Sequence, residues 1–284
     1  MLNIDQLLKN AAVKLMQVSP TANLDAELIL CHVLGCTRVD LILKKYDIVS
    51  EELSSAYETL IEERLSGNPV SYIVGKQEFM GLDFEVNKHV LIPRPDTEIL
   101  IEQLVGLVDS KVPINVLDIG TGSGAIPIAL AHFLKHAKAW TIDISVEASE
   151  VAKNNAKRNH VDDRITFLLG DLYEPLNTID EPLKFDVIVS NPPYIPSADI
   201  EDLQVEVATF EPRLALDGGS DGLDFYRRIV KDALIHLKVD GIIAFEIGYD
   251  QAQAVAKLLE ERGFTKIKVV KDLAGKDRVV IGRL

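Results

Sequence analysis

Apolar side chains recur every three or four positions over the first 65 residues, which is the spacing of one face of an α-helix. One run ends at Leu15, and a second follows Pro20, where Thr21 is placed to cap a new helix. A third helix is predicted over residues 51–65, because its first turn is acidic and a Gly-Asn-Pro sequence follows it. The pattern therefore predicts a small helical domain, whose first two helices carry the apolar residues Leu7, Leu8, Ala11, Ala12, Leu15, Leu24, Ala26, Leu28, Leu30 and Val33.

The pattern changes over residues 70–90, where short and partly alternating apolar stretches predict a hairpin. In the following segment, LIPRPDTEIL, two prolines favour an extended chain, and Asp96 or Thr97 is placed to cap a helix that reaches Val108. We therefore expect three parts: a helical N-terminal domain over residues 1–70, a hairpin linker over 71–92 and a second domain over 93–284.

From residue 113 onward, apolar strand-like runs alternate with helical ones. The predicted strands are Ile114–Asp118, Ala139–Ile142, Ile165–Leu169, Phe185–Ser190 and Gly241–Glu246, and the predicted helices are Ile126–Leu134, Val146–Arg158 and Phe225–Leu237. This alternation predicts an α/β fold with a parallel sheet covered by helices. The last two strands, over 264–270 and 278–282, have no helix between them, so they form an antiparallel hairpin that makes the sheet mixed.

Composition narrows the class of protein. With 284 residues, of which 47% are hydrophobic and 26% charged, the chain matches a globular protein of about two domains, and disordered or collagen-like classes are excluded. Thirty Lys and Arg stand against 44 Asp and Glu, and the net charge of −14 disfavours a protein that wraps nucleic acid. No leader pattern and no apolar run of about 18 residues occurs, so we expect neither secretion nor a membrane span. Cys31 and Cys36 cannot build a disulfide framework, which favours the reducing cytoplasm.

A glycine-rich turn follows the first strand of the second domain. In NVLDIGTGSGAIPIAL, residues 115–130, Gly120, Gly122 and Gly124 permit positive φ and close approach of a ligand beside a helix N-terminus. Asp143 ends the next strand, 19 residues after Gly124, at about the distance where a carboxylate accepts both ribose hydroxyls of a nucleotide. A dinucleotide and S-adenosylmethionine both fit, since Ala125 completes G-x-G-x-x-A; Asp143 by itself is also compatible with a helix N-cap.

The sequence SNPPY, residues 190–194, directly follows the apolar strand FDVIV. Proline has no N–H, so a Pro-Pro pair at a strand end presents carbonyl acceptors without competing donors. The Asn191 side-chain oxygen and the Pro192 carbonyl can each accept one N–H of a planar NH₂ group, and Tyr194 can pack against its face. This favours chemistry on a planar nitrogen.

Together these motifs resemble a class I S-adenosylmethionine-dependent methyltransferase, with a Rossmann-like, mostly parallel seven-stranded sheet and an antiparallel terminal strand. The segments RLSGNPVSYIVGKQEFMGLDFEVNKHVLIPRPDTE, EPRLALDGGSDGLDFYRRI, FEIGYDQ and AGKDRVVIGR are more specific. With the DAELIL of the N-terminal region, they are similar to the release factor glutamine N5-methyltransferase family over nearly the whole chain.

The resemblance implies a role for each matching residue. Gly120, Thr121, Gly122, Ser123 and Gly124 would hold the methionine part of the cofactor, Asp143 the ribose, and Asp171 and Leu172 the adenine. Asn191, Pro192, Pro193 and Tyr194 would hold the substrate glutamine, with Asn191, Pro192 and Tyr194 catalytic and Asn191 also beside the cofactor. Several family members have an aromatic residue where Leu172 stands, so this adenine contact is expected to be apolar. Arg94 would help to close the site.

The implied reaction is transfer of a methyl group from S-adenosylmethionine, leaving S-adenosylhomocysteine, to the side-chain nitrogen of the glutamine in the Gly-Gly-Gln loop of class I release factors. We expect a cytoplasmic monomer whose N-terminal domain recognises the release factor, with no direct nucleic-acid or membrane partner. The alternatives are an N6-adenine DNA or RNA methyltransferase, which shares NPPY, a catalytically silent cofactor-binding adaptor and a nicotinamide dehydrogenase.

Other features have simpler interpretations. His132 and His136 lack a third partner, so no metal is expected. Cys31 and Cys36 are interpreted as buried thiols. Glu246 is compatible with a pocket residue or with a structural carboxylate. The seven basic residues after position 260 are interpreted mainly as the solvated face of a strand.

Overall fold

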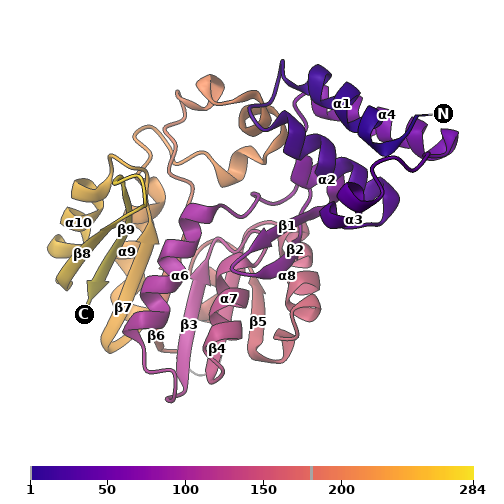
Figure 1. Cartoon of the computed structure of the whole chain (residues 1–284). Helices are drawn as coiled ribbons and strands as arrows, with labels where there is room; N and C mark the ends of the chain where they lie inside the picture. Colours follow the sequence, from indigo (N-terminus) through magenta and orange to yellow (C-terminus); the bar gives the residue numbers. More distant parts are fainter. Residues whose placement is uncertain (1, 180–181) are drawn as a thin grey trace. The chain divides into compact units, whose positions relative to one another are not determined.

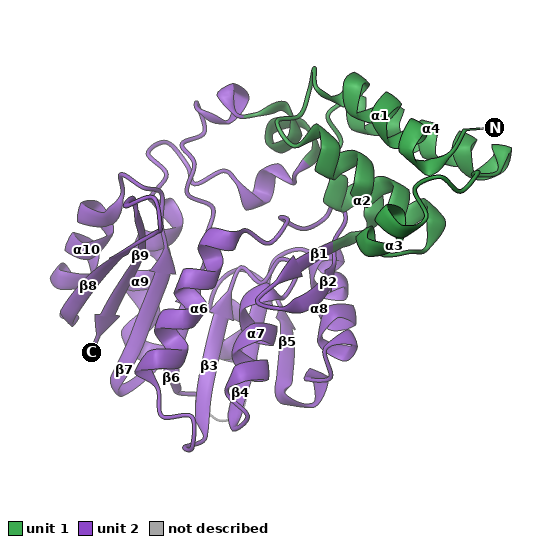
Figure 2. Ribbon diagram, in the orientation of Figure 1, with its two compact units in different colours: residues 1–76, 204–210 green, residues 77–203, 211–284 purple. Residues whose placement is uncertain are grey.

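The computed structural model describes residues 2–179 and 182–284, which form two compact units. Unit 1 comprises residues 1–76 and 204–210, and unit 2 comprises residues 77–203 and 211–284 (Figure 2). The chain therefore passes from one unit to the other three times. The domain boundaries at residues 70 and 92 stay a prediction.

Unit 1 is a small helical bundle. Three long helices, α1 (Ile4–Leu15), α2 (Ala22–Leu34) and α4 (Glu51–Leu65), confirm the helices expected from the apolar spacing. Two short helices, α3 (Arg38–Leu43) and α5 (Val70–Val74), were not predicted, since neither is long enough to repeat a face. Thr21 is the N-cap of α2, but its hydroxyl donates to Asp25 and caps no backbone N–H.

A buried arginine joins the segment 204–210 to the helices of unit 1. The Arg64 guanidinium, with a side chain only 3% exposed, pairs with Asp25 at 2.8 Å and with Glu206. A side chain at Gly67 would meet Val205 and Phe210, so this glycine permits their close approach. If segment 204–210 left its place, Arg64 would lose Glu206 and its buried charge would be less well compensated. The ion pair therefore favours the observed position of this segment.

A two-stranded sheet stands where the chain passes into unit 2, which starts at Gln77. Its strands are β1 (Lys76–Phe79) and β2 (Leu82–Glu85), joined by a turn at Met80–Gly81. Helix α6 (Pro95–Leu107) follows, with Arg94 at its N-cap. The expectation that Asp96 or Thr97 caps this helix is wrong, because Pro95 already supplies a helical φ and the N-cap lies two or three residues earlier, at Arg94. The Glu98 carboxylate accepts the backbone N–H of Met80 at 2.7 Å and ties the turn to α6.

The central sheet has seven strands in the order β5-β4-β3-β6-β7-β9-β8. Its strands are β3 (Ile114–Ile119), β4 (Ala137–Asp143), β5 (Ile165–Leu169), β6 (Phe185–Ser190), β7 (Leu237–Glu246), β8 (Thr265–Lys271) and β9 (Asp277–Arg283). Strands β3 to β7 pair in parallel, whereas β9 pairs antiparallel with both β7 and β8. The predicted mixed sheet is confirmed, with the antiparallel strand inserted between β7 and the edge strand β8.

Helices cover both faces of this sheet (Figure 1). The successive helices α6, α7 (Ala125–Phe133) and α8 (Val146–Arg158) contact one another, and α9 (Asp224–His236) contacts α10 (Ala252–Glu261). Helix α10 was not predicted, although Ala252, Val255 and Leu259 are buried at helical spacing. Within the described residues, no helix combines the length and apolar character needed to cross a membrane.

Candidate active site

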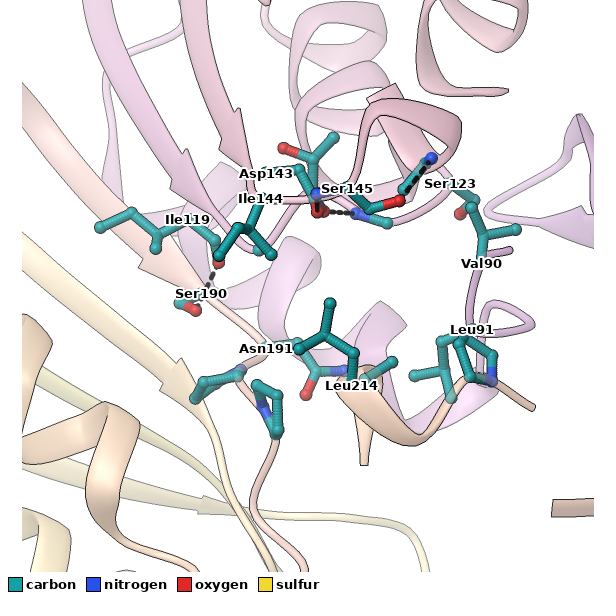
Figure 3. Close-up of a pocket in the computed structure, with 18 of the residues that line it drawn as sticks. Val90, Leu91, Ile119, Ser123, Asp143, Ile144, Ser145, Ser190, Asn191 and Leu214 are labelled. Atoms are coloured by element: carbon teal, nitrogen blue, oxygen red, sulfur yellow. Dashed lines mark hydrogen bonds between the residues drawn. The ribbon is translucent and has the colours of Figure 1, made fainter. Parts of the chain in front are cut away.

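A cavity of about 250 Å³ lies where the carboxyl ends of four neighbouring strands meet, at β3, β4, β5 and β6 (Figure 3). Parallel α/β sheets bind ligands at this edge. Most of the residues expected to bind cofactor or substrate line it together: Gly120, Thr121, Gly122, Ser123, Asp143, Asp171, Leu172, Asn191, Pro192 and Pro193. Gly124 and Tyr194 are not among the lining residues.

The three glycines after β3 do different things. Gly120 and Gly122 have φ of +80° and +54°, and a Cβ atom at either would enter open space. Their bare backbone is therefore a cradle that side chains would fill. Gly124 has φ of +84°, but a Cβ atom there would lie 2.8 Å from Ile128 and 3.2 Å from Ala152. Its missing side chain allows α7 to pack against α8, and the sequence did not distinguish this from ligand approach.

Asn155 on α8 holds the glycine turn through hydrogen bonds. Its fully buried side chain donates to the Ser123 carbonyl and to the Glu85 carbonyl at 2.9 Å, and it accepts from the Glu85 N–H at 2.6 Å. One amide thus joins α8, β2 and the turn. Nothing in the sequence pattern singled out this residue, since an asparagine in a helix is ordinarily solvent-exposed.

Asp118, at the end of β3, is fully buried beneath the glycine turn. One carboxyl oxygen accepts from the Thr141 hydroxyl at 2.9 Å, and Thr121 hydrogen bonds to Thr141 in turn. The other oxygen, Oδ1, has no hydrogen-bond partner. Burial raises the pKa of the Asp118 carboxyl to about 7, against the smaller opposing effect of the threonine hydroxyls.

Asp143 ends β4 and reaches the cavity from the opposite side of the turn. Its carboxylate accepts the Gly122 N–H at 2.8 Å and the Ser145 N–H at 2.9 Å. The N-cap of α8 is Ser145, whose hydroxyl oxygen accepts the Ala148 N–H. Asp143 is therefore not the helix cap, and its two oxygens keep lone pairs for hydroxyl groups in the cavity.

The loop after β5 forms an apolar end of the cavity. Leu172 holds a positive φ of +49°, which is unusual for a branched side chain and places it in the lining. Phe225 and Ile229 of α9 line the same cavity. Asp171 pairs with Arg228, whose guanidinium lies 5.7 Å from the Phe225 ring centre. Phe225 and Arg228 were missed because they lie more than 50 residues from the motif that they complete.

The segment after β6 places Asn191 and the two prolines at the cavity. The preceding Ser190 is buried, and its hydroxyl donates to the Ile119 carbonyl at 2.6 Å, which locks β6 to β3 (Figure 3). Asn191 donates through Nδ2 to the Thr97 hydroxyl oxygen of α6 at 3.4 Å. Helix α6 therefore helps to hold the Asn191 side chain.

Tyr194 turns toward the core of the unit. Its ring packs with the hydrophobic core, and burial raises the pKa of its hydroxyl to about 12. Its carbonyl accepts from Gln251 at 2.9 Å, and Gly222 allows this close approach because a Cβ atom there would lie 2.3 Å from the same carbonyl. The packing of Tyr194 against a substrate amide stays a prediction.

Two further segments complete the wall. Residues 88–91, 93 and 94 line one side, and Pro212, Leu214 and Ala215 of the EPRLAL sequence line another. Arg94 pairs with the buried Glu211, so the two segments are joined at the rim. Arg94 thus lies where the resemblance placed it, whereas the participation of the EPRLAL segment was not predicted.

The residues that had simpler interpretations in the sequence do not line this cavity: Cys31, Cys36, His132, His136 and Glu246. No three His, Cys, Asp or Glu side chains gather as a metal-ligand set in residues 2–179 and 182–284. Cys31 and Cys36 are half-buried in unit 1, and burial raises the pKa of Cys31 to about 11. Glu246 is 1% exposed at the end of β7, and burial raises the pKa of its carboxyl to about 7.

The raised pKa values of the Asp118 and Glu246 carboxyls predict a specific pH dependence of stability. Asp118 and Glu246 hold protons more tightly in the folded state than in the unfolded chain, so their stabilisation is complete at low pH and is lost as the pH rises through about 7. Between pH 5.5 and 8, each carboxyl is expected to lower the free energy of unfolding by on the order of 2 kcal/mol. Denaturant unfolding without cofactor should show this decline.

The matched variants are Asp118→Asn and Asp162→Asn. Asp118→Asn should flatten the decline between pH 5.5 and 8, because it removes one of the two titrating groups. Asp162 is exposed, so Asp162→Asn should decline as the unaltered chain does. An equal slope in all three proteins would contradict the assignment.

The cavity fits a nucleoside that carries an amino-acid tail. The open backbone of Gly120 and Gly122 leaves space for a charged tail, the Asp143 carboxylate suits vicinal hydroxyls, and Leu172 and Phe225 suit a flat ring. Asn191 and Pro192, whose oxygens can accept from an NH₂ group, line the same cavity. This fold and this site define a class I S-adenosylmethionine-dependent methyltransferase.

Comparison with known proteins gives the family. Residues 6–75 match the model of the PrmC N-terminal domain, and residues 95–210 match that of the methyltransferase small domain. The release factor glutamine methyltransferase of Clostridium acetobutylicum is 42% identical over 96% of this chain and 97% of its own length. The enzyme of the same name from Geobacter sulfurreducens is 44% identical over 93% and 90%. The chain belongs to the release factor glutamine methyltransferase family.

Solved structures support the fold. The N-terminal domain of human METTL16, in complex with SAH, matches with a TM-score of 0.53 at 19% identity, over 78% of this chain and 82% of that one. A methyltransferase from Pyrococcus furiosus matches with a TM-score of 0.51 at 19% identity, over 72% and 90%. At this identity the likeness shows a shared fold.

Proposed function

We propose that this protein methylates the N5 side-chain nitrogen of the glutamine in the Gly-Gly-Gln loop of class I peptide-chain release factors. The observation that carries the proposal is the position of the Asn191–Pro192 acceptor pair in the same cavity as the nucleoside cradle. The family relatives named above are release factor glutamine methyltransferases by name, which supports glutamine in a release factor as the substrate. We propose further that the protein acts as a monomer in the cytoplasm, without contacting nucleic acid or membrane.

Each part of the cofactor has residues suited to hold it. S-adenosylmethionine supplies a methyl group on a positively charged sulfur, which makes that carbon an electrophile. The backbone from Gly120 to Ser123 would hold the methionine part, and Asp143 would accept the ribose hydroxyls. Asp171 and Leu172 would lie along the adenine.

The amide acceptors of the protein act on the substrate. An amide nitrogen is a poor nucleophile because its lone pair is delocalised into the carbonyl. The Asn191 oxygen and the Pro192 carbonyl would each accept one N–H, which favours the localised lone pair and fixes its direction. As the new bond forms, positive charge develops on this nitrogen, and fixed carbonyl dipoles stabilise it. Alignment of two bound reactants contributes roughly 7–11 kcal/mol in favourable cases.

The motif itself provides no strong general base. The carboxylates among the lining residues, Asp143 and Asp171, are engaged by backbone N–H groups and by Arg228, respectively. The nitrogen is therefore expected to lose its proton after methyl transfer, when its acidity is high.

An N6-adenine methyltransferase is the alternative, because adenine also presents a planar NH₂ group. The net charge of −14 disfavours it, since nucleic-acid binding depends on phosphate neutralisation by Lys and Arg. The family relatives favour a protein substrate as well.

One experiment separates the two functions. The purified protein is incubated with methyl-labelled S-adenosylmethionine and either a class I release factor, the same factor with the loop glutamine replaced by alanine, or duplex and single-stranded nucleic acid. Label on the loop glutamine, located by mass spectrometry, supports the proposal. Label on adenine alone, or on no glutamine, overturns it.

A further inference from the structure

Three sequence segments that received no chemical role meet directly behind Asn191. They are the start of α6, which carries Asp96 and Thr97, the end of β7 at Glu246, and the start of β9 at Arg278. Thr97 is 4% and Glu246 1% exposed. Two buried polar side chains thus lie against the residue that holds the substrate nitrogen, and such groups are costly unless they are hydrogen-bonded.

With Glu246 ionised, the hydrogen bonds among these side chains run in one direction, because a carboxylate can only accept. The Thr97 hydroxyl donates to Glu246 Oε2 at 2.5 Å, so its own oxygen remains as an acceptor. It accepts from Asn191 Nδ2 at 3.4 Å, and Asn191 also hydrogen bonds to the Glu246 carboxyl. A hydroxyl whose proton is committed to a carboxyl oxygen can only accept from a third group.

This direction decides which end of the Asn191 amide is available. The two ends of a side-chain amide have nearly the same shape, but one donates and the other accepts. With Nδ2 held at Thr97 and Glu246, the carbonyl oxygen is the end left for a group in the cavity. A flipped amide would present a donor to the NH₂ of a substrate, and two donors repel.

The surroundings of Glu246 hold it in place. The Tyr226 hydroxyl donates to the Glu246 main-chain carbonyl at 2.9 Å. Arg278, with a side chain 12% exposed, pairs with Asp96 at 3.2 Å and with Asp272 at 3.3 Å, and it acts electrostatically on Glu246. Helix α6 and strands β7 and β9 thereby fix both the carboxyl and the threonine.

We propose that Thr97 and Glu246 are positioning residues that set the orientation of the Asn191 amide and so specify an NH₂-bearing substrate. The inference rests on the proposed role of Asn191 as an acceptor. It extends that role from the NPPY motif to two residues, 94 positions before and 55 positions after Asn191, of which Thr97 also lines the cavity.

The test compares Thr97→Val with Thr97→Ser. Valine keeps the shape of threonine but removes the hydroxyl, so Asn191 loses its buried acceptor, whereas serine retains it. Thr97→Val should lower kcat on a release factor by about 10- to 100-fold, because a small misplacement of a positioning group costs up to this much. The KM for the release factor and the Kd for S-adenosylhomocysteine should change less than about threefold. Thr97→Ser should restore most of the lost kcat.

A second measurement does not depend on catalysis. The side-chain NH₂ signals of Asn191, assigned in an ¹⁵N-labelled sample through their loss in Asn191→Ala, should move in Thr97→Val and stay near their original positions in Thr97→Ser. The same melting temperature in both variants shows that folding is retained.

The outcomes are distinguishable. If Thr97→Val has the kcat of Thr97→Ser and leaves the Asn191 signals in place, the proposal is overturned. It is also overturned if Thr97→Val weakens binding of S-adenosylhomocysteine as strongly as it lowers kcat. If the unaltered protein fails to methylate release factors but the Asn191 signals respond as expected, the proposed function fails and the orienting contact stands.

Discussion

Replacing Asn191 with alanine is expected to lower kcat for methylation of a release factor by about 10²- to 10³-fold, the cost of removing one preorganised polar group from a transition state. The variant loses the side-chain oxygen that accepts one N–H of the substrate amide, while the Pro192 carbonyl remains. The lone pair of the nitrogen is then neither localised nor aimed as well. Single-turnover measurements with saturating cofactor and release factor report this step directly.

Asn154→Ala is the matched control for this substitution. Asn154 is exposed on α8, outside the cavity lining, so the same chemical change there should leave kcat unaltered. Binding of S-adenosylhomocysteine to Asn191→Ala should weaken only a few-fold, because most of the nucleoside cradle is intact. Near-normal turnover by Asn191→Ala with cofactor bound would show that the acceptor model is wrong.

Filling the cradle at Gly120 is expected to abolish cofactor binding without unfolding the protein. A Cβ atom at Gly120 meets nothing within 4 Å, and the residue lines the cavity, so the side chain of Gly120→Leu would occupy the space of the ligand. Calorimetry should find S-adenosylhomocysteine bound more than about 100-fold more weakly, since the leucine and the ligand exclude each other.

The control for backbone strain is Gly120→Ala. Both variants pay about 1–2 kcal/mol for a side chain at positive φ, so they should share the same loss of melting temperature. Only leucine is long enough to block the cavity. Equal affinities of the two variants for S-adenosylhomocysteine would rule out the cradle at this position.

The parts of the site that the sequence predicted are those that depend on the backbone of one short segment. The glycine turn and NPPY each follow a strand, and neighbouring parallel strands end at one edge of a sheet, so Gly120, Asp143 and Asn191 had to converge. The alternation of strands and helices predicted the sheet for the same reason. The apolar residues Ala252, Val255 and Leu259 of helix α10 also recur at helical spacing, although this helix was not predicted.

The remaining parts depend on contacts that no local pattern encodes. Thr97 and Glu246 are 149 residues apart, and Arg94 and Glu211 are 117 apart. In the sequence, none of these residues differs from an ordinary polar residue, because its partner is close only in the folded chain. Gly124 is the opposite case, since packing against Ile128 and Ala152 already accounts for a glycine there, and its role toward the cofactor stays a prediction. Local motifs indicate where chemistry happens, and tertiary contacts decide how its groups are oriented.

The division of unit 1 into two stretches of chain has a consequence for synthesis. During translation, residues 1–76 emerge first, but Glu206, which pairs with Arg64, follows 142 residues later. Until then, Arg64 has Asp25 but not Glu206 as an acidic partner, and the surface beside Gly67 lacks Val205 and Phe210. The N-terminal helices therefore reach their final packing only after β6 and the NPPY segment have left the ribosome. A shortened chain that begins after residue 76 would carry residues 204–210 without the helices that they contact.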